Sequence, residues 1–313
     1  MKDILVLGGA HIDRRGRIAG TTAPAASNPG SWAEEAGGGA FNCARSLARL
    51  GHVVTLVSPR GGDAEGEAVA LAAAAAGVID RPFTFLDRRT PSYTAILERD
   101  GNLVIALADM DLYRLFSPRR LAVRQVRDLM DKAGAMLTDA NLPPETLGAI
   151  ARAARERNIP LAAIGISPAK VVRYAEVLPG VDWLFMNEAE ARALTGEDPG
   201  DHRQWPAILR DAGLKGGAIT RGGTELVAWD SSGSAFLTPP PLETIGDVTG
   251  AGDGFAAGFL HVRLSGGTLG EAVQHGAASA RLALASEMAT AEDLSREMLM
   301  GALALVPAAE IVL

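Results

Sequence analysis

A short stretch in the last third of the sequence, Asp247-Val248-Thr249-Gly250-Ala251-Gly252-Asp253, combines small residues with two carboxylates. An apolar stripe that starts at Phe255 predicts that a helix begins at these glycines. The free N–H groups and the dipole of a helix N-terminus suit an anion such as a phosphoryl group. Asp253 falls in the first turn, where its carboxylate could take a proton from a substrate hydroxyl. The alternative is a glycine turn with an aspartate near the helix cap and no chemistry.

A second glycine cluster, Gly37-Gly38-Gly39, lies shortly before Asn42 at the start of a predicted helix over 40–50. Its backbone groups and the Asn42 amide could cradle a polar ligand, and a flexible loop that ends in a helix cap explains the pattern equally well. No Gly-Lys-Ser/Thr follows, and Gly8-Gly9 lacks the spacing of the dinucleotide fingerprint. P-loop ATPases and dehydrogenases are therefore disfavoured.

Polar residues also follow two predicted strands. Asn187 and Glu190 come after the strand at 181–186, and Thr220-Arg221-Gly222-Gly223 ends another strand. Ligands of open α/β sheets gather at the carboxyl ends of the strands, so Asn187 and Glu190 could face phosphates and Mg²⁺. Asn followed three residues later by Glu is also a capping-box pattern, and this structural explanation has equal weight.

The remaining candidates carry weaker signals. Asp13 follows the first predicted strand and could bind a ligand, or it could form a turn beside Arg14 and Arg15. Cys43 has no partner for a disulfide, and no G-x-S-x-G stretch supports a serine hydrolase. Metal-ligand spacing is missing among the five histidines, which are His11, His52, His202, His261 and His275.

The elements that must position these residues alternate between strand and helix, which predicts an α/β fold with a mostly parallel sheet covered on both faces. Short apolar runs predict buried strands at 4–9, 53–58, 134–139, 160–166, 181–186 and 216–220. Helical patterns lie between them, at 40–50, 64–76, 144–157, 188–195 and 202–212, and from about residue 250 the pattern is all helical.

One region departs from this alternation. The runs at 93–98 and 103–108 flank Arg99-Asp100-Gly101-Asn102, which is a strong hairpin signal. With the Gly-, Pro- and Thr-rich segment 12–30, this hairpin is expected to form a small sheet that stands off the main body. We therefore expect a single catalytic domain over 1–313, with a lid formed by segments at about 12–30 and 80–110.

Composition narrows the class of protein. The 313 residues are 48% apolar and 21% charged, with a formal net charge of −7. A disordered chain is excluded by the apolar content, and the acidic balance argues against a nucleic acid polymer as partner. No apolar run approaches the roughly 20 residues that span a bilayer. The expectation is a soluble cytoplasmic protein without a membrane partner.

Together the motifs resemble those of the ribokinase-like (PfkB) family of carbohydrate and nucleoside kinases. The Gly-Gly motif that ends in Asn is matched by Gly37, Gly38 and Asn42, and the Asn-x-x-Glu motif by Asn187 and Glu190. Residues 247–253 look like the D-T-x-G-A-G-D signature of the family. The resemblance covers essentially the whole chain. It implies a Rossmann-type three-layer α/β/α sandwich with a small β-sheet lid.

The resemblance also implies roles for individual residues. Asp253 would be the catalytic base, and Gly250, Ala251 and Gly252 would form the anion hole. ATP would be the co-substrate, with Glu190 holding Mg²⁺ through water. Asp247 and Thr249 would bind a monovalent cation such as K⁺. The nucleotide would be bordered by Asn187, Thr220, Gly222 and Ala277, and the acceptor would be held by Asp13, Gly37, Gly38, Asn42 and Asn141.

Several stretches are similar to the pseudouridine kinases of this family, namely 27–30, 90–93, 108–110 and 139–141. They imply transfer of the γ-phosphoryl group to the 5′-hydroxyl of a nucleoside, best pseudouridine. The alternatives are a kinase for ribose, fructose or adenosine, and a relative that binds an anion without chemistry. Two residues depart from the family pattern: Phe41 is expected to reshape the sugar pocket, and Glu225 to alter the nucleotide loop. Exposed sheet edges of the lid suggest a homodimer.

Overall fold

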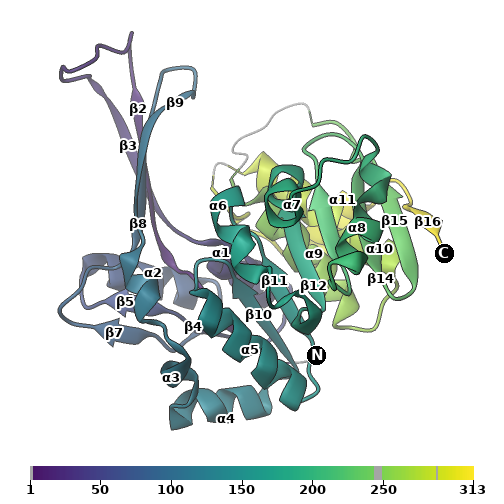
Figure 1. The fold of residues 1–313 in the computed structure, drawn as a ribbon. Helices are drawn as coiled ribbons and strands as arrows, with labels where there is room; N and C mark the ends of the chain where they lie inside the picture. Colours follow the sequence, from purple (N-terminus) through teal and green to yellow (C-terminus); the bar gives the residue numbers. More distant parts are fainter. Residues whose placement is uncertain (1–2, 243–248, 287) are drawn as a thin grey trace.

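A ten-stranded sheet runs through the computed structural model, which describes residues 3–242, 249–286 and 288–313 (Figure 1). Its order is β16-β15-β14-β13-β12-β11-β10-β1-β4-β6. The strands from β13 to β6 are parallel, and β14, β15 and β16 are antiparallel. Their bounds are β1 Ile4–Leu7, β4 Val54–Val57, β6 Ile79–Asp80, β10 Ala135–Asp139, β11 Leu161–Ile164, β12 Trp183–Asn187, β13 Gly217–Thr220, β14 Leu226–Asp230, β15 Gly233–Leu237 and β16 Glu310–Val312.

Helices cover both faces of this sheet, because its strands are apolar on both sides. Ile4 and Val6 of β1 belong to one core cluster, and Leu5 and Leu7 belong to the other. The first cluster packs under α1 Gly39–Arg49, α2 Ala64–Ala75, α9 Ala251–Arg263, α10 Leu269–Ala285 and α11 Arg296–Leu303. The second packs under α3 Pro118–Leu121, α4 Arg124–Lys132, α5 Pro144–Glu156, α6 Pro168–Val171, α7 Glu188–Thr195 and α8 Trp205–Asp211. The predicted three-layer α/β/α arrangement is confirmed.

A four-stranded sheet projects from the main body, in the order β3-β2-β8-β9 (Figure 1). We call it the lid sheet. Its strands are β2 His11–Ile18, β3 Gly30–Gly37, β8 Ser92–Leu97 and β9 Leu103–Asp109. The predicted hairpin is therefore present as β8 and β9, and Gly101 adopts a positive φ of 94° in its turn. A separate two-stranded sheet pairs β5 Pro59–Gly61 with β7 Phe83–Phe85.

The boundaries of the lid sheet differ from those expected. Strand β3 was not predicted, because its sequence lacks apolar alternation and its strand conformation depends on pairing with β2. Residues 79–85 do not join the lid sheet, since β6 pairs with β4 and β7 pairs with β5. Strand β16 likewise corrects the all-helical expectation for the C-terminal part, because the edge strand β15 recruits it. Among the described residues, each helix is too short or too polar to cross a membrane.

Helices α9 and α10 pack closely enough to require a glycine at their contact. A Cβ atom at Gly258 would overlap the carbonyl oxygen of His275 and lie 2.7 Å from Cβ of Ser279. Gly258→Ala is therefore expected to lower the free energy of unfolding by about 1–3 kcal/mol, measured by urea denaturation. Gly301→Ala on α11 is the control, because a Cβ atom there meets nothing within 4 Å and should stabilise by about 0.5–1 kcal/mol. Equal stability of both variants would contradict the close contact.

Candidate active site

The candidate site lies where the strand order of the central sheet reverses direction. From β1 the chain adds β4 and β6 on one side, whereas β10, β11, β12 and β13 follow on the other. Such a switch point leaves a crevice at the carboxyl ends of the two central strands. Gly8 and Gly9 follow β1 there, and Asp139 ends β10.

The Asp139 carboxylate ties three segments together at this point. Its oxygens accept hydrogen bonds from the backbone N–H of Gly9 (3.1 and 3.2 Å) and from Ala40 N–H (3.1 Å). They also accept from the backbone N–H and the side-chain amide of Asn141, at 3.0 and 2.9 Å. Asp139 is fully buried. This carboxylate therefore fixes the loop after β1 and the start of α1 against the end of β10.

The predicted acceptor residue Asp13 lies at the base of the lid sheet, on β2. One carboxylate oxygen is 3.2 Å from Nε2 of His11, and the other lies against Gly37, where a Cβ atom would clash with it. Nδ1 of His11 is 2.9 Å from the Tyr113 hydroxyl. In the neutral imidazole, the contact with the carboxylate assigns the proton to Nε2, so that Nδ1 accepts from the Tyr113 hydroxyl. Burial raises the pKa of Tyr113 well above its usual range, so this hydroxyl stays protonated.

The two glycine-rich helix starts meet at Asp253. Nδ2 of Asn42 donates a hydrogen bond of 2.9 Å to Oδ2 of Asp253. A Cβ atom at Gly39 would lie 3.2 Å from the other oxygen, Oδ1. Helices α1 and α9 thus bring Asn42 and Asp253 together from positions 211 residues apart in the sequence.

The environment of Asp253 places its titration near neutrality. Burial is the largest cause and raises its pKa to about 7, with further upward contributions from the charges of Asp139, Glu190 and Asp13. The hydrogen bond from Asn42 opposes this rise, because it favours the ionised form. A carboxylate with a pKa near the working pH is suited to general-base catalysis.

The N-terminus of α9 lies beside this carboxylate. Gly250 caps the helix with φ of +78°, and a Cβ atom there would clash with the carbonyl oxygen of Ala289. Around Gly252 a Cβ atom would meet no heavy atom of the described residues within 4 Å. The first four N–H groups of an α-helix have no partner within the helix, so those of residues 250–253 can face a ligand. Thr249 is exposed, and Asp247 lies outside the described residues.

Asn187 and Glu190 form the full capping box of α7. Asn187 Oδ1 accepts from the Glu190 N–H (2.9 Å), while the Glu190 oxygens accept from the Asn187 N–H and Nδ2 at 2.9 and 3.0 Å. Glu190 is nonetheless directed to the site, since a Cβ atom at Gly165, just after β11, would lie 2.7 Å from its Oε2. Within the described part of the chain, each Glu190 oxygen accepts one hydrogen bond, and a carboxylate offers about four acceptor positions. The residue therefore fits a water-mediated Mg²⁺ contact.

Two of the predicted nucleotide residues, Asn187 and Thr220, end neighbouring strands. Thr220 ends β13 in register with Asn187. Gly222 has φ of +62°, and a Cβ atom there would meet none of the described atoms within 4 Å. Ala277 lies within α10 and packs into the core cluster, with 5% of its surface exposed. Glu225 was expected to alter this loop. Its carboxylate lies 2.6 Å from Nε2 of His202 and 2.7 Å from Nη2 of Arg203. The hydrogen bond from Arg203 is the main cause that lowers the pKa of Glu225 to about 2.

Phe41 was expected to reshape the sugar pocket, and the structure places it elsewhere. Its side chain is fully buried in the core cluster under α1, so it does not line a pocket. The guanidinium of Arg45 lies 4.7 Å from the centre of its ring. The helical spacing of four residues explains this contact.

Three cations near the site were not identified from the sequence. Arg45 donates to Asn42 Oδ1 (2.7 Å), Lys170 Nζ donates to Asn141 Oδ1 (2.7 Å), and Arg173 donates to the carbonyl oxygen of Asn141 (2.9 Å). Burial lowers the pKa of Lys170. No motif marks these residues, because they serve polar partners that only the fold brings within reach.

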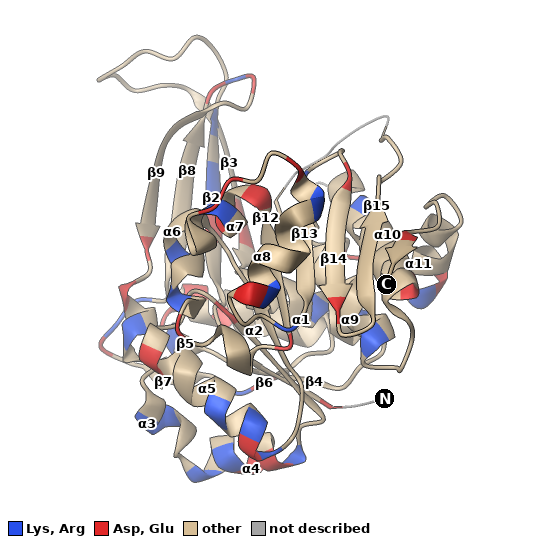
Figure 2. Ribbon diagram, turned by 45° about the vertical axis from the view of Figure 1, so that its right-hand side comes forward, with Lys and Arg blue, Asp and Glu red and all other residues tan. Residues whose placement is uncertain are grey.

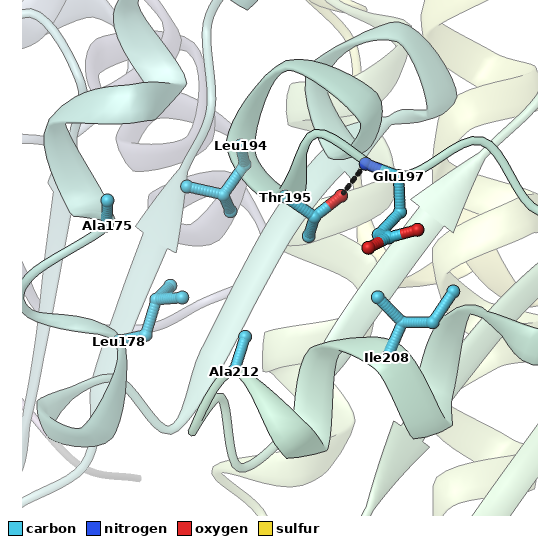
Figure 3. Close-up of a pocket in the computed structure, with 7 residues that line it drawn as sticks. All are labelled: Ala175, Leu178, Leu194, Thr195, Glu197, Ile208 and Ala212. Atoms are coloured by element: carbon cyan, nitrogen blue, oxygen red, sulfur yellow. Dashed lines mark hydrogen bonds between the residues drawn. The ribbon is translucent and has the colours of Figure 1, made fainter.

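A separate hollow of about 260 Å³ lies among α7, α8 and two 3₁₀ turns, η2 Val172–Tyr174 and η3 Leu178–Gly180 (Figure 3). Five of its seven lining residues are apolar, and none belongs to the predicted site; the seven are Ala175, Leu178, Leu194, Thr195, Glu197, Ile208 and Ala212. The part of the chain that the structure describes contains no cluster of three His, Cys, Asp or Glu residues that could hold a metal ion.

The chain is similar to several known proteins. Residues 1–295 match the pfkB family of carbohydrate kinases. Pseudouridine kinase from Escherichia coli (strain K12) is 28% identical over 299 residues, covering 93% of each chain. The uncharacterized sugar kinase YeiI of the same organism is 30% identical and covers 97% of this chain and 83% of its own. A solved carbohydrate kinase from Agrobacterium tumefaciens is 60% identical, with a TM-score of 0.91 over 100% of both chains.

The raised pKa of Asp253 predicts a pH-dependent effect of its substitution on stability. The folded protein keeps this proton up to about pH 7, whereas the unfolded chain releases it near 3.8. Over this range the group is ionised in the unfolded chain but protonated in the folded protein. The free energy of unfolding of wild type therefore falls progressively as the pH rises. Asp253→Asn should gain stability over wild type between pH 5 and 7, by at most about 1.4 kcal/mol per pH unit, with a plateau above. Urea denaturation across this range measures the difference, and a constant difference would contradict the assignment.

Proposed function

The chain belongs to the pfkB family of carbohydrate kinases and is a phosphotransferase with an alcohol group as acceptor, and we propose that this alcohol is the 5′-hydroxyl of a nucleoside, best pseudouridine. The observation that carries the proposal is the position of Asp253. Its carboxylate titrates near neutrality, is held by Asn42 and lies in the first turn of α9, beside the free N–H groups of that helix.

Asp253 acts as the general base in this proposal. It accepts the proton of the acceptor hydroxyl while the oxygen attacks the γ-phosphorus of ATP and the bond to the β-phosphate oxygen breaks. The backbone N–H groups at Gly250, Ala251 and Gly252 stabilise the charge on the transferred group. Phosphoryl transfer asks mainly for such positioning and charge stabilisation.

The nucleotide binds across the carboxyl ends of β12 and β13 in this proposal. Asn187, Thr220, Gly222 and Ala277 border ATP, and Glu190 would hold Mg²⁺ through water. When bound, Mg²⁺ neutralises charge on the phosphates. Thr249, with Asp247, is the proposed contact for a monovalent cation such as K⁺.

The acceptor binds between the main sheet and the base of the lid sheet, against Asp13, Gly37, Gly38, Asn42 and Asn141. The bonds of Asp13 to His11 and of Asn141 to Asp139 and Lys170 support this, because they fix the polar groups that would meet sugar hydroxyls. The lid sheet would close over the acceptor and exclude water, which limits ATP hydrolysis. We propose a single catalytic domain that works in the cytoplasm.

A sugar kinase remains the second candidate, since the relative YeiI, a sugar kinase by name, is 30% identical. ADP release with Mg-ATP should be measured for pseudouridine, uridine, adenosine, ribose and fructose. The highest kcat/KM is expected for pseudouridine. A clear preference for ribose or fructose would replace the nucleoside by a sugar, and no ADP release with any acceptor would overturn the kinase assignment for this site.

Asp253→Asn tests the role of the base in the same assay. We expect turnover to fall by about 10²–10⁴-fold, because the general base is lost, while the protein still binds nucleotide and acceptor. Isothermal titration with ATP provides the binding control. Near wild-type turnover in Asp253→Asn would show that another group takes the proton.

We also propose that two copies of the chain pair through their lid sheets. The strand register places Trp32, Ile96 and Ile105 on one face of the lid sheet and Asp13 on the other face. Leu107 lies on the same face as Ile105. Trp32, Ile105 and Leu107 expose 52%, 65% and 70% of their surfaces. Strand β9 is an edge strand, and it has no charged residue from Leu103 to Ala108 (Figure 2). Exposed apolar edges of this kind favour pairing with a second copy.

Ile105→Lys combined with Leu107→Lys tests this pairing. Wild type is expected to elute as a dimer in size-exclusion chromatography with light scattering, and the double variant as a monomer. The control is Leu86→Lys, because Leu86 is 88% exposed but lies outside the lid sheet. A monomeric wild type at micromolar concentration would contradict the proposal.

A further inference from the structure

Arg45 is a buried cation that is connected to the proposed catalytic base, Asp253, through the side chain of Asn42. It lies one turn after Asn42 on α1, exposes 5% of its surface and donates from Nη2 to Asn42 Oδ1 at 2.7 Å. Its guanidinium also lies over the Phe41 ring. Among the residues that the structure describes, none is a hydrogen-bond partner of its Nε. Burial of a guanidinium with so few acceptors is unfavourable, and burial lowers the pKa of Arg45 to about 10. Such a residue calls for a functional explanation.

The chemistry of Arg45 fixes the direction of the hydrogen bonds in front of it. A guanidinium can only donate, so the oxygen of the Asn42 amide must face Arg45. The amide nitrogen then faces Asp253 and donates to Oδ2. Asn42 therefore presents N–H to the base, an arrangement that favours the ionised carboxylate.

The charges around Asp253 show why this orientation matters. Asp139 of β10, Glu190 of α7 and Asp13 of β2 all raise its pKa, and burial raises it further. From α1, Asn42 donates to it, and the charge of Asp253 acts on Cys43 and on Arg45. Glu35 of β3 is a further carboxylate near Arg45. The hydrogen bond from Asn42 and the charge of Arg45 thus oppose several influences that favour the protonated, inactive form.

We infer that Arg45 is a positioning residue, which locks the Asn42 amide so that Asp253 faces an N–H donor and stays ionised as a base. This inference rests on the proposed role of Asp253. Without Arg45 the amide can rotate and turn its oxygen toward Asp253, and this oxygen accepts a hydrogen bond only from the protonated carboxyl group.

The test measures the ionisation of Asp253 directly, without substrate. In protein labelled with ¹³C at aspartate carboxyl carbons, the Asp253 signal is assigned by its disappearance in Asp253→Asn and followed from pH 5 to 9. We expect a midpoint near 7 in wild type and a midpoint about one pH unit higher in Arg45→Met. Arg45→Gln keeps a donor toward Asn42 Oδ1 without the charge, so an intermediate shift is expected; it also serves if Arg45→Met does not fold.

Arg49→Met is the matched control on the same helix. Arg49 donates to Thr290 Oγ1 and to the carbonyl oxygen of Ala291 instead, so its loss should lower Tm without moving the Asp253 midpoint. A midpoint that stays unchanged in both Arg45 variants would overturn the inference, whatever their stability.

Kinetics separate this inference from the proposed function. In Arg45→Met, the acid limb of the kcat/KM profile should move upward by the same amount, so that activity is reduced about tenfold below the wild-type midpoint and recovers at high pH. A uniform loss of activity at every pH would indicate a merely structural role and would contradict the inference. A wild type without kinase activity would refute the proposed function alone, because the carboxyl titration would still report on Arg45.

Discussion

The buried carboxylate of Asp139 is the interaction on which the site depends. It gathers N–H donors from the loop after β1, from the start of α1 and from the residue that follows β10. A fully buried charge is stable only when it is well hydrogen-bonded, so these segments are held in one arrangement. The start of α1, and with it Asn42, is thereby fixed at the switch point of the sheet, where α9 presents Asp253.

Electrostatics then decide what this arrangement can do. Asp13, Asp139, Glu190 and Asp253 come from four different elements, and their mutual repulsion and burial make ionisation of Asp253 costly. The amide of Asn42 compensates in part. The result is a carboxyl group that changes its protonation state near neutral pH, next to a helix N-terminus that attracts anions. Under the proposed function, proton acceptance and anion binding take place at adjacent positions.

The sequence predicted the layers, the lid hairpin and the two glycine-rich helix starts, because periodicity and turn chemistry are local signals. Strands β3 and β16 were not predicted, because their strand conformation depends on pairing with β2 and β15, respectively. Asn42 and Asp253 were predicted separately, and the structure brings them within 2.9 Å. The parts played by Asp139 and Arg45 could not be predicted, because their importance depends on partners brought near by folding. Phe41 was wrongly expected at the sugar pocket, as its orientation on α1 depends on core packing.

The two roles of Glu190 limit which substitutions the protein can accept at this position during evolution. The same carboxylate completes the capping box of α7 and contributes charge at the site. A chain that lost the activity could not discard this residue freely, because helix α7 would lose its cap as well. The acidic character of the site is thus protected by folding itself. A relative that retains Glu190 has kept a stable helix, and this residue alone is a poor marker of whether it still performs the chemistry.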